Sequence, residues 1–479
     1  MVFSSTIFLF VFLPLTLAFY ALTPRPARNA MLLTASLFFY AWGELGYIVI
    51  MLGSTTTNYG FGLWIASAPE RSRPRRLRLG LAVAANLGLL LYFKYAPFLV
   101  TNLNILLAAV GSPTLPLPDV HLPLGISFFT FQAISYVVDV ARGTVRVQRN
   151  LADIALYIAL FPQLIAGPIV RYQDVADQIQ RRTVTLDLFA SGVRLFVVGL
   201  AKKVLLANPL GEPADAIFNS PALALPPSVA WLGLFLFFLQ LYFDFSGYSD
   251  MAIGLGRMFG FRFLPNFHYP YISKSLTEFW QRWHISLSTW FRDYLFLPLG
   301  GYRGSKLRSY LHLLIVFVLC GLWHGASWNF LFFGLYQGAF LVFERLVRIR
   351  KIHGFQFPLG NLYFLFALMT SMVFFRTDTL PHALDFFRAL FGFSHPLPLV
   401  YQTASYFTPE LLIILFCAVV GSLPIAPWIS RRIAAIETHF PIGFSVRQGM
   451  ILLLMTALFV WSSMKLAAGT HNPFIYFRF

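Results

Sequence analysis

Residues 309 to 328 read SYLHLLIVFVLCGLWHGASW, an apolar stretch without a carboxylate, lysine or arginine. About 20 mainly apolar residues are enough for a helix to cross the hydrocarbon of a bilayer. The stretch therefore predicts a membrane-spanning helix. At a rise of about 1.5 Å per residue, His324 lies roughly 20 Å along this apolar run.

Similar stretches recur along the chain, and we expect ten spans with one to three more. The others are 3–22, 30–52, 79–100, 188–206, 229–243, 330–347, 361–375, 410–428 and 449–466. Hydrophobic residues make up 58% of the sequence and charged residues 11%, whereas about a quarter of a soluble domain is charged. Continuous runs fit helices, not the alternating strands of a barrel. The sequence predicts an all-α polytopic membrane protein, with about 10 to 13 helices that cross or enter the bilayer.

The formal net charge of +17 comes mainly from short basic blocks between apolar stretches. Two of these blocks, at residues 71–78 and 345–351, are typical of loops that face the cytoplasm. This distribution argues against nucleic-acid binding. Cys320 and Cys417 lie far apart in apolar segments, so neither a disulfide framework nor a zinc spacing is indicated.

No repeat or low-complexity linker divides the chain, so we expect a single membrane-embedded domain over residues 1–479. The prolines of residues 113–123 predict a loop. Residues 161–168, FPQLIAGP, predict a re-entrant or interrupted helix. Residues 257–308 hold too many charges for a lipid-facing span and too many aromatic residues for a free loop. We interpret them as interfacial helices within a chemically important region, residues 240–330.

The central interfacial helix is expected to begin at a capping box formed by Ser275 and Glu278. Aromatic and apolar residues follow at helical spacing. The opposite stripe is polar and includes Gln281, His284 and Ser288. The pattern predicts an amphipathic helix that presents His284 on its polar face.

His324 is the strongest candidate for chemistry, because an ionisable group in an apolar span usually faces a protein interior or a watered cavity. With an unperturbed pKa near 6.5, histidine suits general-base catalysis. A purely structural histidine is equally compatible with the periodicity. Gly321 and Gly325 allow a backbone or ligand to approach closely. Cys320 shares a helical face with His324, but a thioester role is disfavoured relative to a small core residue, and metal binding is less favoured still.

Two carboxylates, Asp244 and Asp250, end a strongly apolar run. They could orient a histidine or a substrate hydroxyl. The favoured interpretation is an interhelical ion pair, for instance with Arg257, Arg262 or Arg282.

Three motifs resemble the membrane-bound O-acyltransferases, within them the alginate O-acetylation branch. They are QLYFDFSGYSDMAIGLG at 240–256, EFWQRWHISLSTW at 278–290 and GLWHG at 321–325. Weaker similarity runs through residue 479. The resemblance implies a ring of helices around a central funnel in the inner membrane of a bacterium. His324 corresponds to the family's invariant histidine, and His284 to its second conserved polar position.

The resemblance also implies the reactants. Acetyl-CoA is the expected donor substrate from the cytoplasm, with no tightly bound cofactor and no metal. The expected acceptor is a polysaccharide hydroxyl or an extracytoplasmic acetyltransferase partner, and alginate, cellulose, peptidoglycan and teichoic acid remain open. Candidate substrate-binding residues lie in or beside the motifs: Asp244, Tyr248, Asp250, Gln281, Arg282, Ser288, Trp323 and Asn329.

The alternative function is a transporter or export scaffold for a polysaccharide or lipid-linked sugar. A pore should carry polar residues along several spans. Here they concentrate between residues 244 and 329, which favours an enzyme.

Overall fold

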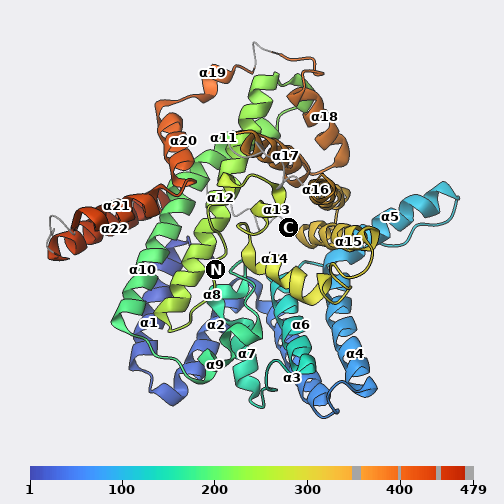
Figure 1. The fold of residues 1–479 in the computed structure, drawn as a ribbon, viewed down its shortest axis with the longest axis vertical. Helices are drawn as coiled ribbons and strands as arrows, with labels where there is room; N and C mark the ends of the chain where they lie inside the picture. The colour runs from blue at the N-terminus through green and yellow to red at the C-terminus, as the bar shows by residue number, and fades with distance from the viewer. Residues whose placement is uncertain (348–357, 398–400, 438–443, 470–479) are drawn as a thin grey trace.

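The computed structural model describes residues 1–347, 358–397, 401–437 and 444–469, and these residues form helices and connecting loops without a strand (Figure 1). The closing motif at 470–479 and residues 348–351 of the second basic block lie outside this part. The helices of the first half are η1 Phe8–Phe12, α1 Leu13–Leu22, α2 Arg28–Glu44, α3 Ile48–Ala66, α4 Arg73–Leu90, η4 Leu91–Tyr95, α5 Ala96–Ala109, α6 Ile126–Arg142, α7 Leu151–Ala159, α8 Phe161–Leu164, α9 Tyr172–Gln180, α10 Leu186–Ala201, η5 Lys202–Ala207 and α11 Asn208–Phe218.

The second half continues in the same way. Its helices are α12 Pro227–Met258, α13 Leu276–Phe279, α14 Ile285–Phe291, η8 Arg292–Phe296, α15 Lys306–His324, α16 Trp328–Leu346, α17 Leu359–Arg376, α18 Leu380–Leu390, α19 Thr403–Tyr406, α20 Pro409–Gly421, α21 Ile425–Glu437 and α22 Phe444–Ala467. The short turns η2 Arg25–Ala27, η3 Leu45–Tyr47, η6 Ala222–Ala224 and η7 Pro270–Ile272 complete the described elements.

Helices occupy all ten stretches that the sequence predicts as spans. Within the described ranges, six helical segments are long and apolar enough to cross a membrane. Two further stretches form shorter apolar helices, Phe8–Leu22 and Pro409–Gly421, and α10 and α16 occupy the remaining two. The predicted all-α polytopic membrane fold is therefore confirmed.

The long helix α12 is the centre of the fold, with α10 and α11 packed beside it (Figure 1). Small residues set the distance between α10 and α12. A methyl group added at Gly199 would lie 2.8 Å from the amide nitrogen of Met251, and one added at Gly254 would lie 2.8 Å from that of Phe196. The two backbones are therefore in contact, as small residues permit in membrane proteins.

Ion pairs join α12 to η5. Lys203 Nζ lies 2.6 Å from the carboxylate of Asp244, and Lys202 Nζ lies 2.6 Å from that of Asp250. The interhelical pairing of the two carboxylates is as expected, but the expected arginine partners are wrong. The sequence spacing did not reveal that η5 packs beside the part of α12 that carries Asp244 and Asp250.

The interfacial region, residues 257–308, differs from the continuous amphipathic helix that the sequence predicts. The Ser275 hydroxyl does cap α13 by accepting a hydrogen bond from the Glu278 amide at 3.1 Å. However, α13 ends at Phe279 and α14 begins at Ile285. His284, between them, has a φ of 43° and is fully buried, so its predicted place on a polar helix face is wrong.

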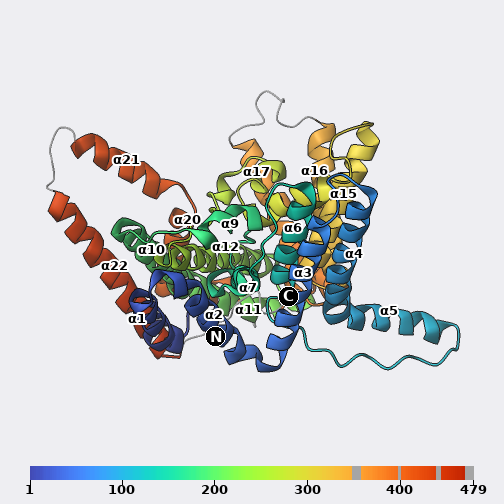
Figure 2. The same ribbon diagram turned by 90° about the horizontal axis from the view of Figure 1, so that it is seen from below.

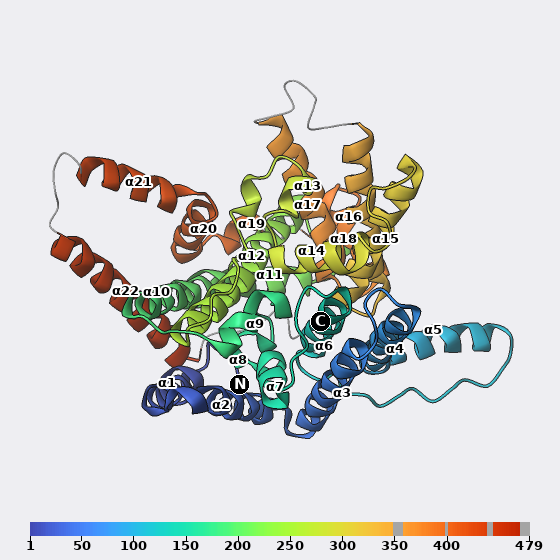
Figure 3. The ribbon, with the colours of Figure 1, turned by 60° about the horizontal axis from the view of Figure 1, so that its bottom comes forward.

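The start of α4 and the end of α16 lie on the same side of the molecule, with α5 and α11 toward the other side (Figure 2). The described residues of the two basic blocks therefore share one side. α5 extends away from the main body, as do α21 and the first part of α22, whereas α20 packs on α11 and η5 (Figure 3). Residues 113–123 form the predicted loop, and residues 161–168 form a buried, interrupted helix.

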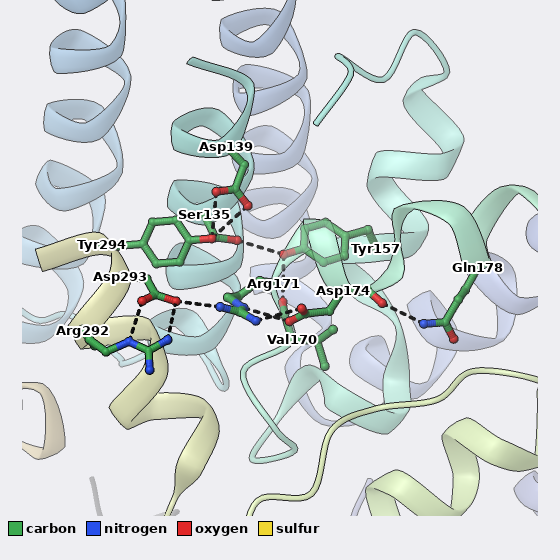
Figure 4. A network of polar contacts seen from close by, with 10 residues as sticks. All are labelled: Ser135, Asp139, Tyr157, Val170, Arg171, Asp174, Gln178, Arg292, Asp293 and Tyr294. Atoms are coloured by element: carbon green, nitrogen blue, oxygen red, sulfur yellow. Dashed lines mark hydrogen bonds and ion pairs between the residues drawn. The ribbon is translucent and has the colours of Figure 1, made fainter. Parts of the chain in front are cut away.

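A polar network fixes η8 against α6 and α9 (Figure 4). The Tyr294 hydroxyl donates to both carboxylate oxygens of Asp139, at 2.9 and 2.8 Å. Arg171 donates to Asp293 at 2.8 Å and to Asp174 at 2.9 Å. The network anchors a segment that forms one wall of the candidate site described next.

Candidate functional site

His324 is the last residue of α15, and only 5% of it is exposed. The chain turns at Gly325 and starts α16 at Trp328. Close packing fixes this corner, since a methyl group added at Gly321 would lie 2.8 Å from the Cα of Gly334 on α16. The prediction that Gly321 admits another backbone is thus confirmed.

The end of α15 is capped by the neighbouring helix. The last carbonyl groups of a helix have no partner within the helix. Here the Tyr95 hydroxyl donates to the Leu322 carbonyl at 2.8 Å, and Lys94 Nζ donates to the Trp323 carbonyl at 2.5 Å. Residues of η4 therefore hold His324 in place.

His284 approaches the same point from the break between α13 and α14. Its Nδ1 lies 3.3 Å from Asn266 Oδ1, and that oxygen also accepts from the Ser286 amide at 3.1 Å. Because the amide can only donate, the Asn266 atom is an acceptor, and Nδ1 of His284 must carry the proton. Nε2 is then a free acceptor. Burial, and to a lesser degree the nearby imidazole of His324, hold the pKa of His284 well below its usual value.

The indole of Trp323 lies between the two histidines. Its ring centre is 4.8 Å from that of His324 and 5.9 Å from that of His284. In the described part of the chain, three buried nitrogens of this group have no hydrogen-bond partner: Nδ1 of His324, Nε2 of His284 and Nε1 of Trp323. Buried polar atoms are normally paired. Because these unpartnered nitrogens belong to three neighbouring rings, this point is the candidate position for a polar ligand.

A large cavity of about 730 Å³ approaches this centre between α13, α14, η8, α15 and α16. Gln281 and Ser288 line it, as do Arg292 and Arg345. Its lining also includes Cys320, one helical turn before His324, and Ile285, the neighbour of His284. The guanidinium of Arg345 stacks on the ring of Tyr302 at 3.6 Å.

Two other cavities lie at the C-terminal end of α15, beyond the residues Leu313 to Cys320 that contact the large cavity. A small cavity of about 180 Å³ is lined by Lys94, Trp323 and His324. A lateral cavity of about 330 Å³ is lined by Lys94 and Gly325, among others. The histidine end of α15 is thus accessible from a side that the large cavity does not occupy.

Of the ten predicted site residues, three meet at the centre and two line the large cavity. The other five make structural contacts. The Asn329 amide donates to Thr377 Oγ1 at 3.1 Å, Arg282 pairs with Glu278 at 2.9 Å, and Tyr248 stacks on Phe3 with ring centres 4.6 Å apart. Asp244 and Asp250 form the lysine pairs described above.

Sequence reasoning missed Lys94 and Asn266. Lys94 is the single charged residue of the apolar stretch 79–100, and an ionisable residue in such a stretch is itself a signal of function. Asn266 carries no comparable signal, because it meets His284 only when the chain is folded. Over the described residues, the structure groups no three histidine, cysteine or acidic side chains in a way that could hold a metal ion.

Comparison with known proteins identifies the family of the chain. The chain belongs to the membrane-bound O-acyltransferase family, whose sequence profile matches residues 114–356. It is therefore a multi-pass membrane O-acyltransferase.

Full-length relatives define the similarity more closely. The chain is 42% identical to the probable alginate O-acetylase AlgI of Azotobacter vinelandii and 40% identical to that of Pseudomonas aeruginosa, with 100% of each chain covered. It is also 36% identical to the peptidoglycan O-acetyltransferase of Helicobacter pylori, over 82% of this chain and 80% of that protein.

Proposed function

We propose that this protein takes an acetyl group from acetyl-CoA at the cytoplasmic side of a bacterial inner membrane and delivers it across the membrane for O-acetylation of an exopolysaccharide such as alginate. The observation that carries the proposal is the grouping of His324, His284 and Trp323, whose unpartnered nitrogens lie in neighbouring rings, between a large cavity that reaches Cys320 and a small cavity that reaches His324. The similarity to alginate O-acetylases supports the choice of acyl group and polymer.

The large cavity suits the donor. Its volume of about 730 Å³ falls within the range of roughly 300 to 1,000 Å³ that is usual for small-molecule sites. Arg292 and Arg345 supply cationic groups for the phosphates of coenzyme A. Arg345 belongs to a basic block, and the positive-inside pattern assigns that side to the cytoplasm.

The acceptor would enter from the other end of α15. Its hydroxyl oxygen attacks the thioester carbonyl carbon while His324 takes the hydroxyl proton. The new C–O bond forms, the C–S bond breaks, and the coenzyme A thiolate leaves. The proton on His324 then passes to the coenzyme A thiolate, and the resulting thiol can donate a hydrogen bond to Nε2 of His284, whose Nδ1 is protonated toward Asn266. Holding the donor and the acceptor in line lowers the activation barrier by several kcal/mol, since alignment of reactants can contribute up to about 7 to 11 kcal/mol.

The acceptor is either a polymer hydroxyl or a hydroxyl of an extracytoplasmic acetyltransferase partner. Both present the same nucleophile to His324. Supplying purified protein with each acceptor separately distinguishes them.

The decisive experiment measures transfer of radiolabelled acetyl from acetyl-CoA by purified protein in proteoliposomes. His324→Ala should abolish transfer, and His284→Ala should weaken it, without loss of protein from the membrane. The matched control is His312→Ala, which removes another buried histidine of α15, one whose Nδ1 faces the Gly301 carbonyl at 3.2 Å. Persistent acetylation by His324→Ala, or equal losses in His324→Ala and His312→Ala, would refute the assignment.

A further inference from the structure

Lys94 is a buried cation beside the reaction centre. Its side chain extends from η4, and the residue is only 9% exposed. None of the carboxylates that the structure describes lies within ion-pair distance of its ammonium. An ammonium group in an apolar interior is unfavourable unless negative charge or several dipoles compensate it.

The hydrogen bonds of Lys94 leave part of its capacity unused. A lysine ammonium has three donor hydrogens. One is directed to the Trp323 carbonyl at 2.5 Å, and a second makes a long contact of 3.5 Å with Ser127 Oγ. The remaining donor has no acceptor among the residues placed in the structure.

The position of Lys94 is also unusual, because it lines both the small and the lateral cavity. In the small cavity it shares the lining with His324. The other basic groups that line these cavities already face partners: Arg376 lies 2.7 Å from Asp215, and His121 lies 3.5 Å from Glu44. Asp378, which also lines the lateral cavity, is acidic and exposed. Lys94 is therefore the cation directed toward whatever occupies these cavities.

We propose that Lys94 is a further substrate-contacting residue, whose ammonium binds a negatively charged oxygen next to the hydroxyl that receives the acyl group. The inference rests on the proposed function. The negative charge has two possible sources: a carboxylate of the acceptor sugar, or the oxyanion formed when the carbonyl π electrons move to oxygen during attack. In the second case the charge returns as the C–S bond breaks.

The test compares Lys94→Met, which removes the charge while keeping an unbranched chain, with Lys94→Arg, which keeps the charge. The matched control is Tyr95→Phe, which removes the adjacent cap on α15 and leaves the charge in place. Acetyl transfer is measured to an alginate oligomer and to the same oligomer with its carboxylates reduced to alcohols. Melting temperatures show that each variant is folded.

If the acceptor carboxylate binds Lys94, Lys94→Met raises KM for the acidic oligomer and leaves KM for the reduced oligomer unchanged. If the oxyanion binds there, Lys94→Met lowers kcat for both acceptors by about 10²- to 10³-fold, the usual effect of losing one oxyanion donor. In either case Lys94→Arg retains more activity than Lys94→Met, and Tyr95→Phe, which removes a cap but keeps the charge, loses clearly less activity than Lys94→Met.

The inference is overturned if folded Lys94→Met matches the wild type with both acceptors, or if Tyr95→Phe reproduces its loss, since Lys94 then acts only as a helix cap. Failure of the proposed function looks different. In that case the wild-type protein transfers no acetyl to any hydroxyl, or transfer does not depend on His324.

Discussion

Replacement of Gly321 by alanine should displace the corner that holds His324 while leaving the fold intact. The added methyl group would lie 2.8 Å from the backbone Cα and nitrogen of Gly334, and closer still to the Phe330 carbonyl. Carbon atoms in good contact are about 3.5 to 4.0 Å apart, so α15 and α16 must separate by about 1 Å. Overpacking of this kind costs about 1–3 kcal/mol.

His324 follows three residues later on the same helix and should move by a similar distance. A misplacement of about 1 Å can reduce a catalysed rate about 10²-fold. We therefore expect Gly321→Ala to lower kcat about 100-fold, with a modest fall in melting temperature. Acetyl transfer and thermal unfolding of the purified protein in detergent measure the two effects.

Gly338→Ala is the control on the same helix pair. Its methyl group would first meet the end of the flexible Leu314 side chain, at 3.0 Å. The Leu314 side chain can rotate, and the Cβ of Phe317, at 3.2 Å, has to move by only a few tenths of an ångström, so the helices stay nearly in place and activity should be close to wild type. Wild-type activity in folded Gly321→Ala, or equal losses in both variants, would show that close helix packing does not position His324.

Three other substitutions test the walls of the site. Glu344→Ala removes the carboxylate that accepts hydrogen bonds from the amides at the start of α13. Each buried donor left without an acceptor costs about 1–3 kcal/mol of stability. The melting temperature should therefore fall clearly in Glu344→Ala and recover in part in Glu344→Gln. Arg171→Ala breaks the link to Asp293 and should raise KM for acetyl-CoA and hydrogen exchange of η8, whereas Arg388→Ala, at an exposed pair, should change neither. The depressed pKa of His284 means that the unfolded state binds more protons below about pH 6.5, so stability should fall on acidification, and His284→Gln should make the melting temperature less sensitive to pH.

The sequence was sufficient to predict the membrane helices and the main irregular segments. Each membrane span can be recognised from the apolar composition of its own residues, without knowledge of the rest of the fold. The loop at 113–123 and the break at 161–168 could also be predicted, because proline restricts its own backbone and that of the preceding residue.

The break at His284 could not be predicted in this way. Helical periodicity continues across residues 276–294, and a capping box precedes it. The left-handed conformation is held by contacts with Asn266, 18 residues earlier in the chain. Only the tertiary fold brings that amide into place, so local propensity is overridden.

Ion-pair partners were unpredictable for a related reason. Asp244 and Asp250 were expected to pair with arginines that follow them in sequence, yet Lys202 and Lys203 approach from an earlier helix. The choice depends on how closely α10 and α12 pack, which in turn depends on the glycines at their contact. Charge patterns identify which groups need partners, whereas packing decides which partners they meet.

The surroundings of His324 likewise depend on how the end of α15 packs. A helix that ends inside a protein leaves carbonyl groups that need donors, and here η4 supplies them through Lys94 and Tyr95. A corner at this point also prevents the chain from filling the space beyond His324, where the small cavity lies. The end of α15 leaves carbonyl groups without partners inside the helix. The same helix end therefore brings together the imidazole of His324, the ammonium of Lys94 and an open cavity, which an uninterrupted span could not do.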